Sequence, residues 1–229
     1  MTAAMPHFRK LFLLCVTAAL AVFSLPAHAQ LGERGTQVHD GSQLKPPAGA
    51  RVAIFEFADM ECPLCAQDNP TLKRAAATYK IPWVRHDFPL RQHVWSFQAA
   101  VNARWFDTRA KKLGDDYRDA VFASQSSIFN LKVLGDFTQK FAQSHGVALP
   151  FAMDPQGKLA ADVKADYALG QRIGVDQTPT IWIVTEHSKG APYMEVPSSL
   201  DNLYQTIDRA LSDTRDTAAP KTQKRSAAR

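Results

Sequence analysis

The sequence predicts an α/β protein in which a mixed sheet is flanked by helices and a further block of helices is inserted into the chain. Segments 51–57, 83–88 and 181–184 are rich in β-branched and aromatic residues, which is the composition of strands. A helical segment joins the first two strands, and this order is typical of a right-handed crossover between parallel strands. Between the second and third strands, apolar residues recur at helical spacing over about 93–170.

The first strand, 51–57, is almost continuously apolar, so we expect it to be buried on both faces of the sheet. The helix after it begins at Cys62 and runs to about Tyr79. Pro70 falls inside this helix and is expected to kink it. The second strand, 83–88, is then predicted to pair in parallel with the first.

The inserted block is predicted to contain helices whose apolar faces pack into a core. The side chains that recur at helical spacing are Val94, Phe97, Val101 and Trp105, then Leu131, Leu134, Phe137 and Phe141, and then Leu159, Val163 and Tyr167. Gly146 and Pro150 are typical of the end of the middle helix, and the last helix is expected to run from about Pro155 to Ile173. These stripes predict core packing and no cofactor site.

The last part of the fold is predicted to be a hairpin followed by a helix. After the strand at 181–184, a turn at 188–190 leads to a strand near 193–196, which favours antiparallel pairing. The final helix is expected to start at Ser198, with Asp201 placed for a capping box. Its predicted buried residues are Leu200, Leu203, Ile207 and Leu211.

The N-terminus has the pattern of a secretory signal peptide. Arg9 and Lys10 precede an apolar run of about 15 residues, which is short of the roughly 20 that span a bilayer. Small residues follow at Ala27 and Ala29, and we expect cleavage after Ala29 and export to the periplasm. The predicted organisation is then a signal peptide at 1–29, an irregular leader at 30–49, one α/β domain at 50–212 and a disordered basic tail at 213–229.

The charge balance argues against nucleic-acid binding. The chain carries 27 Lys and Arg against 22 Asp and Glu. The excess lies in segments 1–29 and 213–229, whereas residues 30–212 carry no net charge. A nucleic-acid-binding protein is expected to carry its positive charge on the folded surface.

The cysteines indicate redox chemistry. Of the three in the chain, Cys15 lies in the predicted signal peptide, so the exported chain keeps only Cys62 and Cys65. Pro63 suits the first helical position, which places Cys62 where free backbone N–H groups and the helix dipole stabilise a thiolate. The spacing of three residues also allows a disulfide, so this pair is predicted to exchange electrons with other thiols and to need no separate cofactor.

Two other interpretations of the CxxC pair stay open. A zinc site would need four ligands, and the five histidines after residue 29 do not have the spacing of a second ligand pair. A copper carrier could combine the two cysteines with His86 or His93. An inert structural disulfide would close so small a loop that it would stabilise the fold little.

Three segments resemble the DsbA-like thiol–disulfide oxidoreductases, which have a thioredoxin-like fold. They are FEFADMECPLC at 55–65, DFPL at 87–90 with His93, and GVDQTPT at 174–180. The resemblance implies a cis peptide before Pro179, a loop there that lies against the CxxC pair, and a Thr178 backbone that pairs with substrate peptide. It also places a buried acid at Glu56, which could exchange a proton with Cys65.

The resulting expectation is a periplasmic disulfide oxidase. Its partners would be unfolded or partly folded exported proteins with thiols and a membrane redox partner that resets the pair. The short leader predicts a monomer, and a disulfide reductase or a copper carrier are the alternatives. Cys62 is expected to be exposed and Cys65 buried, Asp59 and Glu61 are expected to be solvated, and His86 and His93 are expected to be structural.

Overall fold

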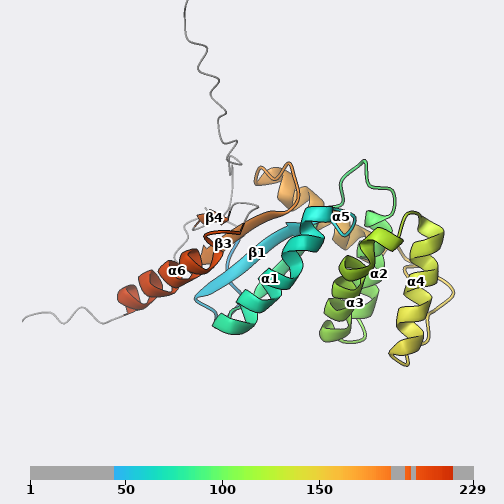
Figure 1. The fold of residues 1–229 in the computed structure, drawn as a ribbon, viewed down its shortest axis with the longest axis horizontal. Helices are drawn as coiled ribbons and strands as arrows, with labels where there is room; N and C mark the ends of the chain where they lie inside the picture. Colours follow the sequence, from blue (N-terminus) through green and yellow to red (C-terminus); the bar gives the residue numbers. More distant parts are fainter. Residues whose placement is uncertain (1–43, 187–193, 197–199, 219–229) are drawn as a thin grey trace, which may run out of the picture. The chain divides into compact units, whose positions relative to one another are not determined.

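The computed structural model describes residues 44–186, 194–196 and 200–218. The chain divides into the units Met1–Gly35 and Thr36–Arg229, and all described residues belong to the second. The predicted signal peptide, most of the leader and the turn at 188–190 therefore lie outside the described residues. Figure 1 labels the helices and strands of the second unit.

The predicted strands and helices occur in the expected order in the described part of the chain, together with helices at 111–124 and 125–127 that were not predicted individually. The elements are β1 (Val52–Ala58), α1 (Pro63–Tyr79), β2 (Trp83–Asp87), α2 (Ser96–Asp107), α3 (Lys111–Ser124), the short 3₁₀ helix η1 (Gln125–Ser127), α4 (Leu131–Ser144), α5 (Lys158–Arg172), β3 (Thr180–Thr185), β4 (Met194–Val196) and α6 (Leu203–Ala218). Pro70 lies inside α1.

The four strands form one mixed sheet in the order β2-β1-β3-β4. β1 pairs in parallel with β2, and this register sets Glu56 opposite Arg85. β1 pairs antiparallel with β3, and β3 pairs antiparallel with β4. The mixed α/β sheet and the hairpin at its end are thus as predicted from the sequence.

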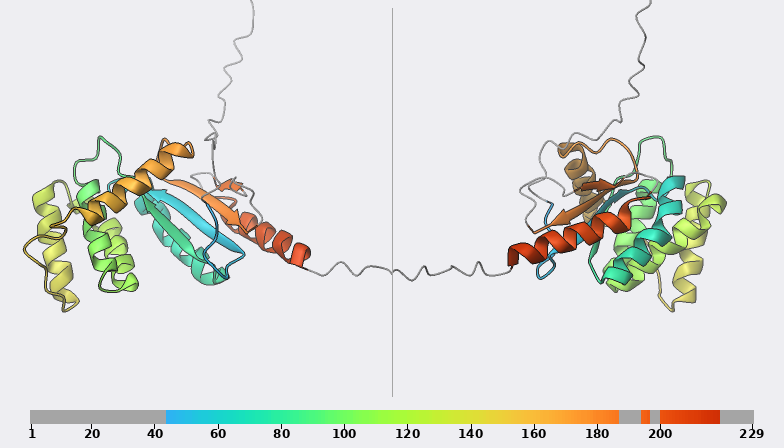
Figure 2. Two further views of the ribbon diagram at one scale, coloured as in Figure 1. Left: turned by 180° about the vertical axis from the view of Figure 1, so that it is seen from behind. Right: turned by 60° about the vertical axis from the view of Figure 1, so that its left-hand side comes forward.

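Alternate residues of β1 face two different cores, because successive side chains of a strand point to opposite faces. Val52 and Ile54 pack with side chains of α1 and α6. Phe55 and Phe57 pack with a second cluster that includes Tyr167 of α5. Helices therefore cover both faces of the sheet, as Figures 1 and 2 show, and β1 is buried on both faces as expected.

The backbone of α5 approaches the sheet closely at Gly170. A Cβ atom at this position would lie 2.7 Å from ring carbons of Phe88 and 3.1 Å from Phe57. Real Cβ atoms are not found so near other atoms, so the helix can lie at this depth only with glycine here. The ring of Phe88 also stacks on Tyr167, with 4.5 Å between centroids.

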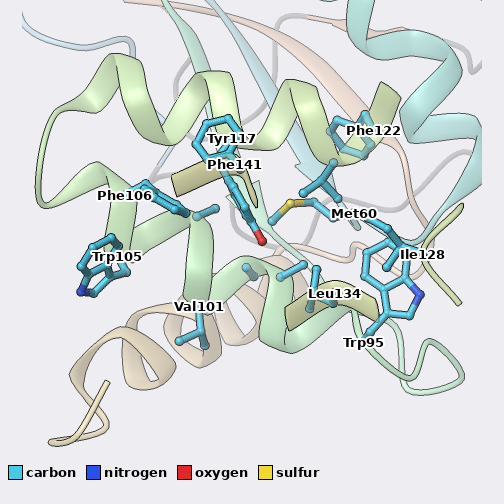
Figure 3. Close-up of a cluster of buried hydrophobic side chains, with 14 of the residues drawn as sticks. Met60, Trp95, Val101, Trp105, Phe106, Tyr117, Phe122, Ile128, Leu134 and Phe141 are labelled. Atoms are coloured by element: carbon cyan, nitrogen blue, oxygen red, sulfur yellow. The ribbon is translucent and has the colours of Figure 1, made fainter. Parts of the chain in front are cut away.

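Helices α2, α3 and α4 lie beside one another and enclose a third core (Figure 1). Figure 3 shows its aromatic centre, where Phe106, Tyr117 and Phe141 meet. The hydroxyl of Tyr117 lies 2.7 Å from that of Thr138, which satisfies it inside the core. Cys62 and Cys65 belong to the same cluster, so the CxxC pair lies where the helical block meets the sheet.

Two of the predicted helical stripes include residues that the structure leaves at the surface. Val94 is 68% exposed and Leu131 is 55% exposed. Val94 precedes the first residue of α2, so the helical spacing does not apply to it, and Trp95 occupies the core instead. Leu131 is the first residue of α4, whose buried face runs through Leu134 and Phe141.

The C-terminal helix is displaced relative to its prediction. Its expected first residue, Ser198, lies outside the described residues, and α6 begins at Leu203. Leu200 has φ +56°, a left-handed conformation that a helix does not contain. The helix continues to Ala218, so the expectation of disorder is wrong for 213–218. Thr214 is buried there, and its hydroxyl donates to the carbonyl of Ala210.

Candidate active site

The two cysteines lie at the start of α1, as predicted. Cys62 is the N-cap residue with an extended backbone, and Pro63 opens the helix. The N–H of Cys62 donates to the carbonyl of Asp59, 3.0 Å away, which closes the turn before the helix. Both cysteines are thiols in this structure, so it describes the reduced pair.

The loop before β3 reaches the first cysteine from a distant part of the chain. The peptide bond between Thr178 and Pro179 is cis, as the resemblance implied. The thiol of Cys62 donates to the carbonyl oxygen of Thr178 at 3.3 Å. The hydroxyl of Thr178 is buried and has no hydrogen-bond partner among the described atoms, which leaves it available to a thiolate.

Hydrogen bonds to its sulfur lower the pKa of Cys62 to about 5. The main cause is the thiol of Cys65, which donates to the thiolate. Burial opposes the shift, and the backbone N–H groups of Cys65 and Leu64 and the hydroxyl of Thr178 add to it. The helix start and the loop before β3 therefore stabilise the same anion.

Cys65 has the opposite properties. It is fully buried, and burial raises its pKa well above the ordinary value, with the negative charge of Glu56 adding to the shift. Cys62 is also more enclosed than expected, with 6% of its surface exposed. Cys62 is therefore less exposed than we expected. Of the two cysteines, only Cys62 combines some exposure with a low pKa.

Glu56 lies in the interior behind the cysteines. It points to the same face of β1 as Val52 and Ile54, which is the face that α1 covers. Its side chain is fully buried, and Oε2 accepts a hydrogen bond from the indole of Trp83 at 3.0 Å. Burial raises the pKa of Glu56 to about 7, although the positive charge of Arg85 lowers it. The predicted burial of this acid is confirmed, and such a pKa suits a group that exchanges protons near neutral pH.

A profile of the thioredoxin family matches residues 47–209, which include every element from β1 to β4 and the first part of α6. The chain belongs to the thioredoxin family. No curated protein matches it.

Solved structures give this thioredoxin-family protein the fold of DsbA proteins. Alpha-DsbA1 from Wolbachia pipientis is 20% identical, with a TM-score of 0.61 over 79% of this chain and all of that one. Alpha-DsbA2 from the same organism, described as a thiol–disulfide exchange protein, is 17% identical, with a TM-score of 0.57 over 72% of this chain and 84% of that one. A periplasmic thioredoxin-like protein from Salmonella enterica serovar Typhimurium is 16% identical, with a TM-score of 0.55 over 72% and 84%.

Of the two acids beside the CxxC pair, Asp59 is not solvated, so that expectation is wrong for it, whereas Glu61 is partly exposed. Asp59 is 1% exposed and accepts hydrogen bonds from the backbone of Leu90 and from Nδ1 of His93, at 2.6 and 2.8 Å. Glu61 accepts from the backbone N–H groups of Trp95 and Ser96 at the start of α2. These carboxylates anchor the loop before the cysteines to the segment before α2. Their negative charge is stabilised by the hydrogen bonds that they accept there.

Sequence reasoning missed two residues of the thioredoxin-family site. The side-chain amide of Gln125 donates to the carbonyls of Met60 and Cys62, both at 2.9 Å, and so ties the helical block to the active-site loop. Nothing in the sequence around Gln125 signals this role. Asp68 is buried on α1 one turn after Cys65. For Asp68 the sequence did contain a signal, because an acidic residue falls at a position that the helical spacing places on the inward face of α1.

The two histidines considered as copper ligands bind carboxylates. Nδ1 of His86 lies 2.9 Å from Asp166, and Nδ1 of His93 lies 2.8 Å from Asp59. This agrees with the structural roles expected for both. Within the described ranges, no group of three His, Cys, Asp or Glu side chains could hold a metal ion. No helix of that part of the chain is long and apolar enough to cross a bilayer.

Proposed function

We propose that this thioredoxin-family protein is a periplasmic disulfide oxidase that exchanges through Cys62 and Cys65. The observation that carries the proposal is the difference between the two thiols, since the pKa of Cys62 is about 5 while that of Cys65 lies well above its ordinary value. A low pKa makes Cys62 a good leaving group and stabilises the reduced pair, which makes the disulfide form oxidising.

The proposed reaction begins with the disulfide form. A substrate thiolate attacks Sγ of Cys62, a bond forms between these two sulfurs, and the Cys62–Cys65 bond breaks. Cys65 leaves with the electron pair and takes up a proton, for which Glu56 is the proposed donor because it is buried behind the pair and titrates near neutral pH. A second substrate thiolate then attacks the substrate sulfur, and Cys62 leaves as a thiolate.

Two electrons thereby pass from the substrate dithiol to the enzyme. We propose unfolded or partly folded exported proteins as substrates, with Thr178 and Pro179 as the loop that meets their backbone. The carbonyl of Thr178 already accepts a hydrogen bond from Cys62, so a peptide joined to that sulfur would lie beside it. A membrane redox partner would restore the disulfide. The apolar segment at 11–25 supports export through a signal peptide.

The pKa of Cys62 indicates how far the reduction potential of the pair is raised. At pH 7 a thiol with a pKa of about 5 stabilises the reduced state by about 3 kcal/mol, which corresponds to about 60 mV for a two-electron couple. We therefore expect a reduction potential above that of thioredoxin, which is about −270 mV.

The test is equilibration of the pair in glutathione buffers, followed by oxidation of a reduced multi-thiol protein with stoichiometric enzyme. A potential above the thioredoxin value together with substrate oxidation supports the oxidase. A potential at or below that value would make a reductase the better interpretation. A stable dimer that corrects scrambled disulfides would indicate an isomerase.

A further inference from the structure

A second carboxyl group is buried near the cysteines. Asp68 lies on the inward face of α1 together with Cys65, Leu72 and Ala75, and only 4% of its surface is exposed. It follows Cys65 by three residues, so the two side chains are neighbours on the helix. Its Oδ2 atom has no hydrogen-bond partner among the described atoms. A buried carboxylate oxygen without a partner is costly, which favours the neutral form or an exchange of protons.

The charges of Asp68 and Cys62 act on Glu56, and the charge of Cys62 also acts on Asp68. Burial raises the pKa of Asp68 to about 6, and the charge of Cys62 adds to the shift. The charge of Asp68 in turn raises the pKa of Glu56. Glu56 also has an oxygen, Oε1, without a hydrogen-bond partner among the described atoms. The two acids thus share one polar region in an otherwise apolar interior.

Few other charged groups face this region. On β2, Arg85 lowers the pKa of Glu56. On α3, Asp119 accepts a hydrogen bond from Asn69, the residue after Asp68. Residues 180–185 of β3 carry no charged side chain. Asp68 is slightly exposed, whereas Glu56 and Cys65 are 0% exposed, so among these three Asp68 is the group nearest to solvent.

We propose that Asp68 passes protons between Glu56 and solvent and so completes the proton path of Cys65. It acts through Glu56 and does not touch substrate, so it is a positioning residue. The inference rests on the proposed role of Glu56 in thiol–disulfide exchange. When Cys65 leaves as a thiolate, Glu56 protonates it, Asp68 protonates Glu56, and solvent protonates Asp68.

In the reverse step, the proton of Cys65 leaves by the same path. Glu56 takes the proton, Sγ of Cys65 attacks Sγ of Cys62 in a mixed disulfide, and the bond between these two sulfurs forms. The bond from Cys62 to the third sulfur breaks, and that sulfur leaves with the electron pair as a thiolate. Glu56 then loses the proton to Asp68, which releases it to solvent.

The test uses this reverse step with glutathione as the third thiol. Reduced protein reacts with oxidised glutathione, and stopped-flow and acid-quench measurements follow the release of glutathione by Cys65 from pH 5 to pH 9. In Asp68→Asn we expect release to be about tenfold slower at pH 7 and slower across the whole range. Asp68→Glu, which keeps a carboxyl group, should recover at least half of the lost rate. Asp116→Asn on α3, where Asp116 pairs with Lys112, is the control and should match the wild type.

If Asp68 acts only through its charge, Asp68→Asn should change the rate of glutathione release in the opposite direction. Removal of the Asp68 charge would lower the pKa of Glu56 and so make more of it ionised at pH 6. Release would then be faster at pH 6 and unchanged at high pH, and this result would overturn the relay. Equal slowing in the Asp116 control would also overturn it. Failure of the oxidase proposal would be seen separately, as a low potential or no substrate oxidation while glutathione release remains measurable.

Discussion

At the scale of single residues, the site depends on two cysteine thiols whose surroundings shift their pKa values in opposite directions. The thiolate of Cys62 is stabilised by the thiol of Cys65, by N–H groups of the helix start and by the hydroxyl of Thr178, whereas Cys65 is fully buried next to Glu56. A thiolate is the attacking and leaving form in disulfide exchange. We therefore propose that Cys62 exchanges with substrates and that Cys65 resolves the mixed disulfide.

This assignment predicts the pattern of alkylation. In the reduced protein, iodoacetamide at pH 6 should modify Cys62 and leave Cys65 unmodified, as peptide mass mapping would show. The rate should follow a titration with a midpoint near pH 5, because the thiolate is the reactive form. Cys62→Ser should abolish the fast reaction. Preferential modification of Cys65 would reverse the two roles.

The buried carboxyl of Glu56 should make stability depend on pH. Its pKa in the folded protein is about 7 against an ordinary value of 4.5, so the folded state binds the proton more tightly than the unfolded state. The free energy of unfolding should therefore fall between about pH 4.5 and about pH 7, by about 3 kcal/mol in total. Glu56→Gln should remove this part of the fall and also slow the resolution of mixed disulfides by Cys65.

Urea unfolding of the wild type and of Glu56→Gln at pH 5 and pH 8 measures the effect. We expect the variant to gain stability relative to the wild type as the pH rises. An equal pH dependence in the two proteins would show that Glu56 does not carry the proton. Unchanged resolution kinetics would return Glu56 to a structural role.

At the scale of elements, the position of α5 on the sheet depends on one glycine. Gly170→Ala would place a Cβ atom 2.7 Å from the ring of Phe88, and we expect a loss of about 1–3 kcal/mol in the free energy of unfolding. Gly135→Ala in α4 is the matched control, since its Cβ atom would meet nothing within 4 Å. This control should be neutral or more stable by about 0.5–1 kcal/mol. Thermal and urea unfolding would compare them, and equal effects would argue against close packing at Gly170.

Ion pairs between elements hold α2 and α5 to the edge of the sheet. Arg104 of α2 donates to Asp87 of β2 at 2.6 Å and also to Asp166 of α5. Asp166 accepts a further hydrogen bond from the backbone of Asp87, and it contacts His86. One arginine thus joins three elements, and the helical block is fastened to the strand that lies beside β1.

At the scale of the whole molecule, the free energy of unfolding should differ between the reduced and the oxidised protein. The folded-state pKa of Cys62 is about 5, below its ordinary value of 9.0, so the thiolate stabilises the fold at high pH and this stabilisation is lost as the pH falls through about 5. At pH 7 it contributes about 3 kcal/mol. The disulfide form has no thiolate, and its small loop stabilises little.

We therefore expect the reduced protein to unfold at a higher urea concentration than the oxidised protein at pH 7. The difference should become smaller from pH 7 to pH 4, because Cys62 becomes protonated in the folded state. Parallel unfolding of the two forms, with the reduced form kept under excess dithiol, measures this. Greater stability of the oxidised form at pH 7 would contradict an oxidising potential and would favour a reductase.

The sequence by itself determined the features that depend on neighbours along the chain. Pro63 after Cys62 predicted a helix start with a low-pKa thiol, because the free N–H groups belong to the first turn of the same helix. The continuous apolar run of β1 and the crossover to β2 also followed from local patterns, whereas the buried acid at Glu56 was implied by the family resemblance. The family resemblance supplied the loop at Thr178 and Pro179, and its cis bond is confirmed.

Only the tertiary structure decided which distant groups meet. Thr178 accepts a hydrogen bond from a cysteine 116 residues away, and Gln125 binds the carbonyl of the same cysteine across 63 residues. Asp59 was expected in solvent, yet it is buried because the segment before α2 folds over it and supplies two donors. Periodicity reports the burial of a residue on a regular element, but the partner of a loop residue depends on how separate elements pack against each other.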